Sequence, residues 1–188
     1  MVIGVLALQG AFIEHENILK KLGVESIELR NKSDLDKHYD GLILPGGEST
    51  VQGKLLKSLD MFDKLKKQIE EGMPVLATCA GMILLSKEVD GETSKNFGTI
   101  PMNVKRNAYG RQLGSFHTFA EVKGVGDVPM SFIRAPYVES VKPEVEVLSV
   151  VDENIVAVKY ENQIALSFHP EVDDDLSIHK KFLKLAQK

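Results

Sequence analysis

The segment Val75-Leu76-Ala77-Thr78-Cys79-Ala80-Gly81-Met82 joins a short apolar strand to an apolar helix that runs on to Leu85. The strand ends just before Cys79, and the neighbours of this cysteine are small, so the backbone can turn sharply there. A free cysteine is more often inert core packing. A helix that begins just after it, however, favours a thiolate and presents free backbone N–H groups. This arrangement is typical of a nucleophile elbow at the end of a strand.

The chain before this elbow alternates between apolar strands and amphipathic helices. Nearly continuous apolar runs are typical of parallel strands that are covered on both faces. They predict strands over 2–8, 24–29 and 41–44, with a helix over 11–22. Spacing by three or four predicts one further helix with the stripe Leu55, Leu59, Phe62, Leu65 and Ile69. We therefore predict an α/β fold of three layers, with a mostly parallel central sheet and helices on both faces, as in flavodoxin-like proteins.

The second half of the chain contains shorter β-like runs. They predict strands over 145–151, 155–160 and 164–168, and a hairpin turn at Asp152-Glu153-Asn154. Three consecutive carboxylates, Asp173 to Asp175, precede a final helix, and we expect them to cap it and to compensate its dipole. They form a poor metal site because neighbouring side chains point apart. No linker or internal repeat is visible, so residues 1–188 are expected to form a single domain.

Composition and charge exclude several classes of protein. The 188 residues are 43% hydrophobic and 27% charged, which is ordinary globular composition and excludes a disordered chain. The net charge of −4 gives no indication of nucleic-acid binding. The apolar run at the N-terminus is too short to span a bilayer, so no membrane association is expected. The single cysteine cannot form an internal disulfide, and we expect a soluble, cytoplasmic protein.

The last apolar strand leads into His169-Pro170-Glu171. In an extended chain, residues 169 and 171 lie on the same side. Glu171 can then hold the imidazole in one tautomer and stabilise its cation, which is the role of the acid in a nucleophile–histidine–acid triad. The other histidines lack an acidic partner at this spacing, and we interpret them as surface residues or hydrogen-bonded core residues. They are His15, His38, His117 and His179.

A glycine turn, Pro45-Gly46-Gly47-Glu48-Ser49-Thr50, follows the third predicted strand. Ser49 or Thr50 is expected to cap the next helix. Glycines also let backbone N–H groups approach a substrate closely, and such a group, with that of Ala80, can stabilise a tetrahedral oxyanion. No Gly-Lys-Ser/Thr follows, so the turn is not a nucleotide P-loop. Turn, elbow and His-x-Glu converge at the carboxyl edge of the sheet, where open α/β folds bind ligands.

These motifs, in this order, resemble the class I, triad-type glutamine amidotransferases. More narrowly, the chain is similar to the family of glutaminase subunits of pyridoxal 5′-phosphate synthase, over essentially its whole length. The segments that carry the resemblance are 5–11, 42–50, 78–81, 104–112, 132–136 and 167–171. One position departs from the superfamily pattern, because Ala77 stands where the elbow usually has glycine.

The resemblance implies hydrolysis of L-glutamine to glutamate and ammonia, with Cys79, His169 and Glu171 as the catalytic triad. The implied oxyanion donors are the N–H groups of Gly47 and Ala80. The implied substrate-binding residues are Gly46, Gly47, Glu48, Arg106, Ile133 and Arg134. No cofactor or metal ion is expected.

The resemblance also implies a partner. The ammonia would pass to a separate (β/α)₈-barrel synthase subunit that makes pyridoxal 5′-phosphate, within a large hetero-oligomer. The loop containing Gln9 and Gly10 lies at the same sheet edge as the expected active site. We expect this loop to meet the synthase and to couple its binding to formation of the oxyanion hole.

Three alternatives remain open. The chain could be a triad glutaminase that serves a different synthase. It could be a stand-alone cysteine hydrolase, although those usually place the histidine close after the cysteine, whereas Cys79 and His169 are 90 residues apart. It could also be a non-catalytic scaffold that keeps the fold. Glutamine-dependent ammonia release that is lost in Cys79→Ala would exclude the scaffold.

Overall fold

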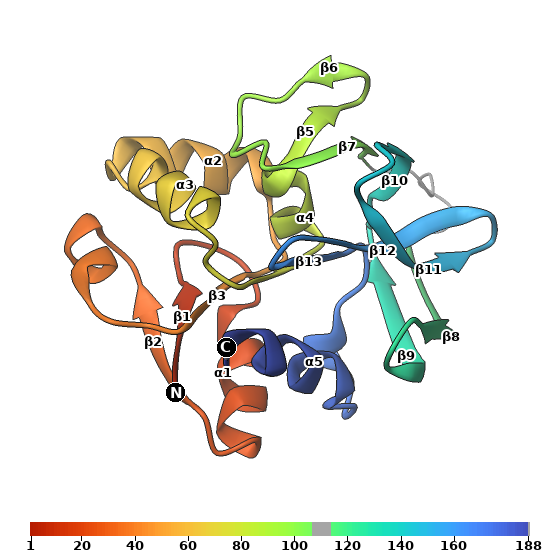
Figure 1. Cartoon of the computed structure of the whole chain (residues 1–188), viewed down its shortest axis with the longest axis horizontal. Helices are drawn as coiled ribbons and strands as arrows, with labels where there is room; N and C mark the ends of the chain where they lie inside the picture. The colour runs from red at the N-terminus through yellow and green to blue at the C-terminus, as the bar shows by residue number, and fades with distance from the viewer. Residues whose placement is uncertain (107–113, 188) are drawn as a thin grey trace.

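The computed structural model describes residues 1–106 and 114–187, and its largest element is a mixed β-sheet (Figure 1). Five strands form the parallel half of this sheet, in the order β2-β1-β3-β4-β13. They are β1 (Val2–Leu6), β2 (Glu25–Leu29), β3 (Gly41–Leu44), β4 (Val75–Thr78) and β13 (Gln163–Leu166). Their carboxyl ends meet at one edge, as the sequence predicts.

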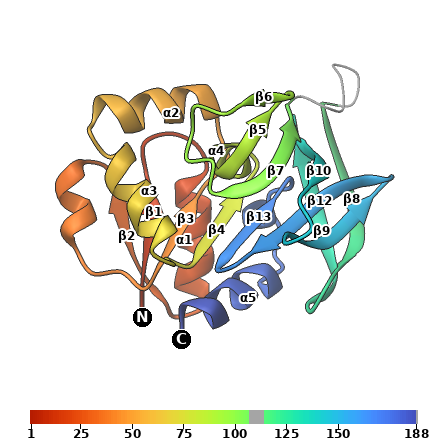
Figure 2. The same cartoon turned by 45° about the horizontal axis from the view of Figure 1, so that its top comes forward.

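Helices cover both faces of the parallel half (Figures 1 and 2). One face carries α1 (Phe12–Lys21) and α5 (Ser177–Ala186), and the other carries α2 (Ser49–Ser58), α3 (Phe62–Glu70) and α4 (Ala80–Leu85). Successive strand residues pack into opposite cores: Leu42 and Leu44 lie with α2–α4, and Ile43 lies with α1 and α5. Double coverage explains the continuous apolar runs and confirms the predicted α/β fold. No helix in the described ranges combines the length and apolarity needed to cross a membrane.

The sheet continues beyond β13 in a second half that is mainly antiparallel, in the order β12-β10-β7-β5-β6, with β11 paired to β12. Its strands are β5 (Ser86–Val89), β6 (Glu92–Thr93), β7 (Ile100–Lys105), β10 (Tyr137–Val141), β11 (Glu146–Val151) and β12 (Asn154–Tyr160). A separate hairpin pairs β8 (Ser115–Val122) with β9 (Gly126–Ile133). The predicted turn between β11 and β12 is confirmed, with positive φ angles at Asp152 and Glu153.

The prediction of one long helix over the stripe from Leu55 to Ile69 is wrong. The chain leaves the helical path after α2, and Asp60 takes a left-handed conformation (φ 54°), which an aspartate tolerates better than most residues. Leu59 is 38% exposed, whereas Leu56 and Met61 are fully buried. The spacing of apolar residues thus indicates which faces are buried, but it does not show that one helix axis continues.

Two short 3₁₀ turns, η1 (Lys32–Asp36) and η2 (Pro170–Val172), complete the described elements. The acidic triplet that follows η2 is only partly a helix cap. Asp175 accepts the N–H of Ser177, the first residue of α5, at 2.8 Å, although Leu176 and not an aspartate holds the N-cap position. Asp173 instead accepts a hydrogen bond from Ser131 on β9, at 3.1 Å. Within the described ranges, no group of three or more metal-ligating side chains could hold a metal ion.

Candidate active site

Cys79 lies between β4 and α4 in a strained backbone conformation (φ 48°, ψ −102°), as expected for an elbow. Its N–H donates to the carbonyl of Leu166 on β13 at 2.8 Å, which ties the turn to the neighbouring strand. Two residues on, Gly81 packs so closely on β3 that a Cβ there would lie 2.1 Å from the Leu44 oxygen. Ala77 is fully buried, so this sheet accommodates a methyl group where the superfamily usually has glycine.

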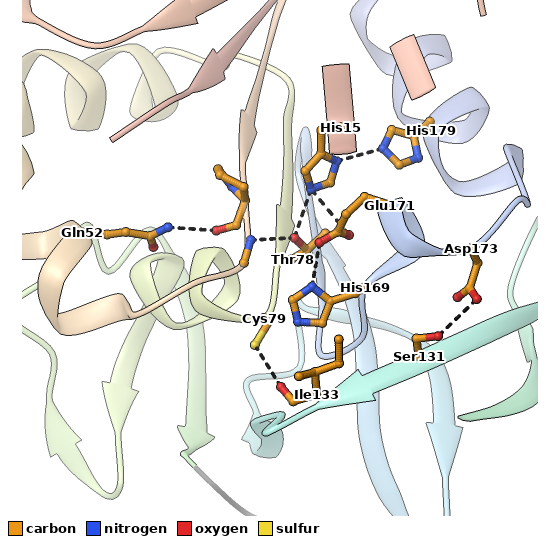
Figure 3. A network of polar contacts seen from close by, with 12 residues as sticks. His15, Gln52, Thr78, Cys79, Ser131, Ile133, His169, Glu171, Asp173 and His179 are labelled. Atoms are coloured by element: carbon orange, nitrogen blue, oxygen red, sulfur yellow. Dashed lines mark hydrogen bonds and ion pairs between the residues drawn. The ribbon is translucent and has the colours of Figure 1, made fainter. Parts of the chain in front are cut away.

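His169 and Glu171 form a short buried contact beside the elbow (Figure 3). His169 Nδ1 lies 2.6 Å from Glu171 Oε1, and both residues are buried. His169 and Glu171 are paired, as predicted, but an extended chain is not what brings them together. The chain is not extended here: the 3₁₀ turn η2, which starts at Pro170, brings the two side chains together. The N–H of His169 also donates to the carbonyl of Ser131 on β9 at 2.8 Å, which fixes the backbone before the turn.

The imidazole of His169 is held in its protonated form. Burial alone would lower its pKa, but hydrogen bonds and charge interactions with Cys79 and Glu171 outweigh burial and raise the pKa to about 10. Figure 3 shows the Cys79 side chain beside the ring on the side away from Glu171. The three side chains therefore lie in sequence, with a proton on the central imidazole at neutral pH. Such an imidazolium can donate to a leaving group.

The glycine turn after β3 packs directly against His169. A Cβ on Gly46 would lie 2.3 Å from His169 Cε1, so only glycine fits there without displacing the ring. The N–H of Gly46 donates to Thr78 Oγ1 at 3.0 Å, which joins the turn to the end of β4. Gly47 has φ 156°, and a Cβ there would lie 2.4 Å from Gln9 Oε1. The turn thus depends on glycine for close approach on both sides.

The loop at Gln9 and Gly10 holds the glycine turn from the other side. Gln9 Oε1 accepts the N–H of Glu48 at 2.8 Å, and the N–H of Ala11 donates to the carbonyl of Gly46 at 3.0 Å. A Cβ on Gly10 would lie 1.9 Å from that same carbonyl oxygen. The buried side chain of Gln52 donates to the Gln9 carbonyl at 3.0 Å. Hydrogen bonds therefore join the loop to the turn, so that a shift of one would move the other.

A cavity of about 290 Å³ opens over the elbow. It is lined by seven predicted site residues, which are Gly47, Glu48, Cys79, Arg106, Ile133, Arg134 and His169. The other predicted site residues lie next to these: Gly46 sits against His169, the buried Ala80 begins α4 next to Cys79, Glu171 contacts His169, and Gln9 and Gly10 contact the glycine turn. Residues 107–112 of the landmark segment lie outside the described residues.

Charged side chains of both signs surround this cavity. Arg106 Nε donates to Asp90 Oδ2 at 2.7 Å, so the guanidinium is held from the hairpin that joins β5 and β6. Arg134 Nη1 lies 3.9 Å from Glu48 Oε1. A free amino acid carries an ammonium and a carboxylate, and a cavity with one carboxylate and two guanidinium groups matches both.

Several residues near the site have roles that the sequence did not predict. His15, interpreted above as a surface or core residue, is fully buried with Nε2 only 3.5 Å from Glu171 Oε2. His15, Ile18 and Leu19 lie on the buried face of α1, and this helical spacing was the available signal for burial. Nothing in the sequence indicated its partners, because His15 and His179 are separated by 164 residues. The role of Asp90, which holds Arg106, was not predicted either, because the two residues are not neighbours in the sequence.

Comparisons with known proteins agree with this geometry. A solved structure described as a glutamine amidotransferase superposes with a TM-score of 0.94 at 43% identity, over the full length of both chains. The structure of PurLQS from Thermotoga maritima, at 17% identity and TM-score 0.70 over 99% of this chain and 96% of its own, shares the fold.

Curated relatives are more similar in sequence. The pyridoxal 5′-phosphate synthase subunit PdxT of Desulfitobacterium hafniense is 60% identical over 97% of this chain and 92% of its own length. The protein of the same name from Haemophilus influenzae (strain PittEE) is 53% identical over 100% and 99% of the two chains. The model of the SNO glutamine amidotransferase family matches residues 5–188. These findings confirm the resemblance carried by the motifs, and the chain belongs to the SNO glutamine amidotransferase family.

Proposed function

We propose that the chain hydrolyses L-glutamine to L-glutamate and ammonia at Cys79, with His169 and Glu171 completing the triad. The observation that carries this proposal is the buried line of these three side chains, of which Cys79 and His169 line the cavity. His169 Nδ1 contacts Glu171 at 2.6 Å, and Cys79 raises the pKa of the same ring from its other side. A cysteine held by a strained elbow against a protonated imidazole is the arrangement that acyl transfer requires.

The reaction follows in two halves. The Cys79 thiolate attacks the side-chain carboxamide carbon, and the oxyanion is stabilised by the backbone N–H groups of Gly47 and Ala80. The His169 imidazolium donates its proton to the leaving nitrogen, so ammonia departs and a γ-glutamyl thioester remains on Cys79. Water then attacks the thioester while His169 accepts its proton. Collapse of the second oxyanion releases glutamate and restores the thiolate and the imidazolium.

Recognition of glutamine falls to the charged groups at the cavity. Glu48 pairs with the α-ammonium, and Arg106 and Arg134 pair with the α-carboxylate. The hydrogen bond from Arg106 to Asp90 supports this assignment, because it holds one guanidinium at the cavity wall before substrate arrives. Gly46, Gly47 and Ile133 complete the substrate site around the side chain of glutamine.

The acceptor of the ammonia is a pyridoxal 5′-phosphate synthase, of which this chain is the glutaminase subunit. The names of the relatives at 60% and 53% identity support this assignment. The partner is a (β/α)₈-barrel subunit, and the two assemble as a large hetero-oligomer. The loop at Gln9 and Gly10 couples partner binding to the oxyanion hole, since it already contacts the glycine turn. With its single free cysteine, the protein works in the cytoplasm.

Ammonia release from L-glutamine tests the proposal, measured first with the chain alone and then in the presence of the synthase subunit. We expect low activity that rises when the synthase is present and that is lost in Cys79→Ala. Activity that ignores this synthase would keep the glutaminase but assign it to another acceptor. Absence of activity in both conditions, with Cys79 reduced, would contradict the assignment as an enzyme and favour a non-catalytic scaffold.

A further inference from the structure

A line of buried polar side chains extends behind the triad, away from the cavity (Figure 3). Glu171 uses Oε1 to contact His169, and its other oxygen, Oε2, has no hydrogen-bond partner in the described part of the chain. His15 Nε2 approaches that oxygen to 3.5 Å, and His15 Nδ1 lies 2.9 Å from His179 Nε2. His15 comes from α1 and His179 from α5, so two helices on one face of the sheet support the triad carboxylate from behind.

Both of these histidines are neutral at physiological pH. Burial holds the pKa of His15 well below its usual value, and electrostatic repulsion by His179, when charged, and by His169 lowers it further. Burial lowers the pKa of His179 to about 4, although the charge of Asp175 partly opposes it. A neutral imidazole has one donor and one acceptor nitrogen, so the question becomes which nitrogen of each ring carries the proton.

The contacts of His179 decide the tautomers. Its Nδ1 is buried and has no hydrogen-bond partner within the described ranges. A buried N–H without an acceptor is costly, whereas an unused acceptor nitrogen is better tolerated. The proton of His179 therefore sits on Nε2 and is donated to His15 Nδ1. His15 then carries its own proton on Nε2, the atom that faces Glu171 Oε2.

The same nitrogen also reaches the oxyanion side of the site. His15 Nε2 lies 3.3 Å from Thr78 Oγ1, and this hydroxyl accepts the N–H of Gly46 in the glycine turn. One N–H thus lies between the triad carboxylate and the hydroxyl that holds the turn. Moreover, α1 begins directly after the Gln9–Gly10 loop, so a shift of this loop would be carried by α1 to His15.

We propose that His15 is a positioning residue for the glutaminase reaction: with its tautomer set by His179, its Nε2–H donates to Thr78 Oγ1 at 3.3 Å and orients Glu171 through the electrostatic contact with Oε2 at 3.5 Å. The inference rests on the proposed function, because it assigns His15 a role in that same site. A neutral donor suits this position, since a second positive charge beside His169 would compete for the carboxylate. His15 does not touch substrate, and it acts through Glu171 and Thr78.

The test compares His15→Leu, which keeps bulk but removes the donor, with His15→Gln, which offers an amide N–H near the position of Nε2. In the complex with the synthase subunit, His15→Leu should lower kcat for ammonia release by about tenfold to hundredfold, because Thr78 loses a hydrogen-bond donor and Glu171 Oε2 loses its nearest polar neighbour. KM should change less than about threefold, and His15→Gln should restore most of kcat. His38→Leu is the matched control, because His38 is exposed and pairs only with Asp40 among the described residues.

Unchanged kcat in His15→Leu would overturn the proposal, and so would equal losses in the Leu and Gln variants or a rise in KM alone. An inactive wild-type complex would instead contradict the proposed function, so the two failures are distinguishable. Should His15→Leu not fold, ¹⁵N NMR of the imidazoles in the wild-type chain gives an independent answer. It should show His15 and His179 neutral at pH 7 with their protons on Nε2, and a proton on His15 Nδ1 would contradict the assignment.

Discussion

The two halves of the molecule contribute to the cavity in different ways. The parallel half provides Cys79, His169 and Glu171, which are 7%, 7% and 5% exposed, from turns fixed by several strands and helices. The antiparallel half and the β8–β9 hairpin provide Arg106 and Arg134, whose side chains are 47% and 71% exposed. Covalent chemistry requires fixed, desolvated groups, whereas capture of a charged amino acid from water requires accessible ones. We expect changes at the buried groups of the parallel half to lower kcat and changes at Arg106 and Arg134 to raise KM.

The largest effect is expected at the elbow. Cys79→Ala removes the nucleophile and should lower kcat by at least about 10⁴-fold, as removal of a triad member commonly does. Ammonia release with the synthase subunit present measures the loss. The unfolding temperature should not fall, because alanine fits the same small site. Residual activity within tenfold of wild type would show that another group attacks glutamine.

A smaller loss is expected from the glycine turn of the same half. A Cβ at Gly46 would lie 2.3 Å from His169 Cε1, so Gly46→Ala must displace either the ring or the turn. We expect kcat to fall by about 10²–10³-fold, comparable to loss of an oxyanion donor. Gly23→Ala is the control: Gly23 has positive φ but nothing within 4 Å of an added Cβ. If both variants lose activity equally, general destabilisation and not the contact with His169 is responsible.

The buried histidines should make the parallel half sensitive to acid. His179 has a pKa of about 4 in the folded state against 6.5 in the unfolded chain, and the pKa of His15 is also lowered. The unfolded chain then binds more protons, so stability is complete above pH 6.5 and is lost as pH falls toward 4. For His179 the loss is about 3 kcal/mol between pH 7 and pH 4.

Urea unfolding at pH 7, 5.5 and 4 measures the slope of the free energy of unfolding against pH. His179→Gln should flatten it, because the variant has no ionisable group at that site. His117→Gln is the matched control for loss of a histidine outside the parallel half, because His117 is half-exposed on β8 beside Asp173. Equal slopes in wild type and His179→Gln would show that other groups govern acid unfolding.

The smallest effect is expected at the support of Arg106. Asp90→Asn weakens its ion pair with Arg106, and because both side chains are about half exposed the pair contributes only about 1 kcal/mol. KM for glutamine should rise about fivefold while kcat stays constant. Glu146→Gln, which breaks the ion pair with Lys123 in the same half, should change neither constant. A fall in kcat with unchanged KM would place Asp90 among the groups that govern the chemistry.

The parallel half was also the more predictable half, because its signals are local. The elbow at Cys79, the glycine turn at Gly46 and Gly47, and the pairing of His169 with Glu171 each occupy a few consecutive residues. Periodicity could not show that Asp60 breaks the helix after α2, because both resulting helices bury the same kind of stripe. The pairing of His169 with Glu171 was predicted from an extended chain, whereas the turn η2 creates it.

Contacts between distant segments could not be predicted from one sequence. His15 meets Glu171 and His179 only because α1 and α5 share one face of the sheet. Ser131 supports His169 and Asp173 only because the β8–β9 hairpin lies over η2. Each of these residues has an ordinary local pattern, and its role arises from tertiary packing.

The most direct test of the division between the two halves is covalent labelling by a glutamine analogue with a diazomethyl ketone in place of the carboxamide. With the synthase subunit present, peptide mass mapping should find the label on Cys79 alone, with protection by L-glutamine. Arg106→Gln should raise the analogue concentration needed for half-maximal labelling without lowering the rate at saturation. Labelling of another residue, or a lower labelling rate at saturation in Arg106→Gln, would contradict this division of roles between the two halves.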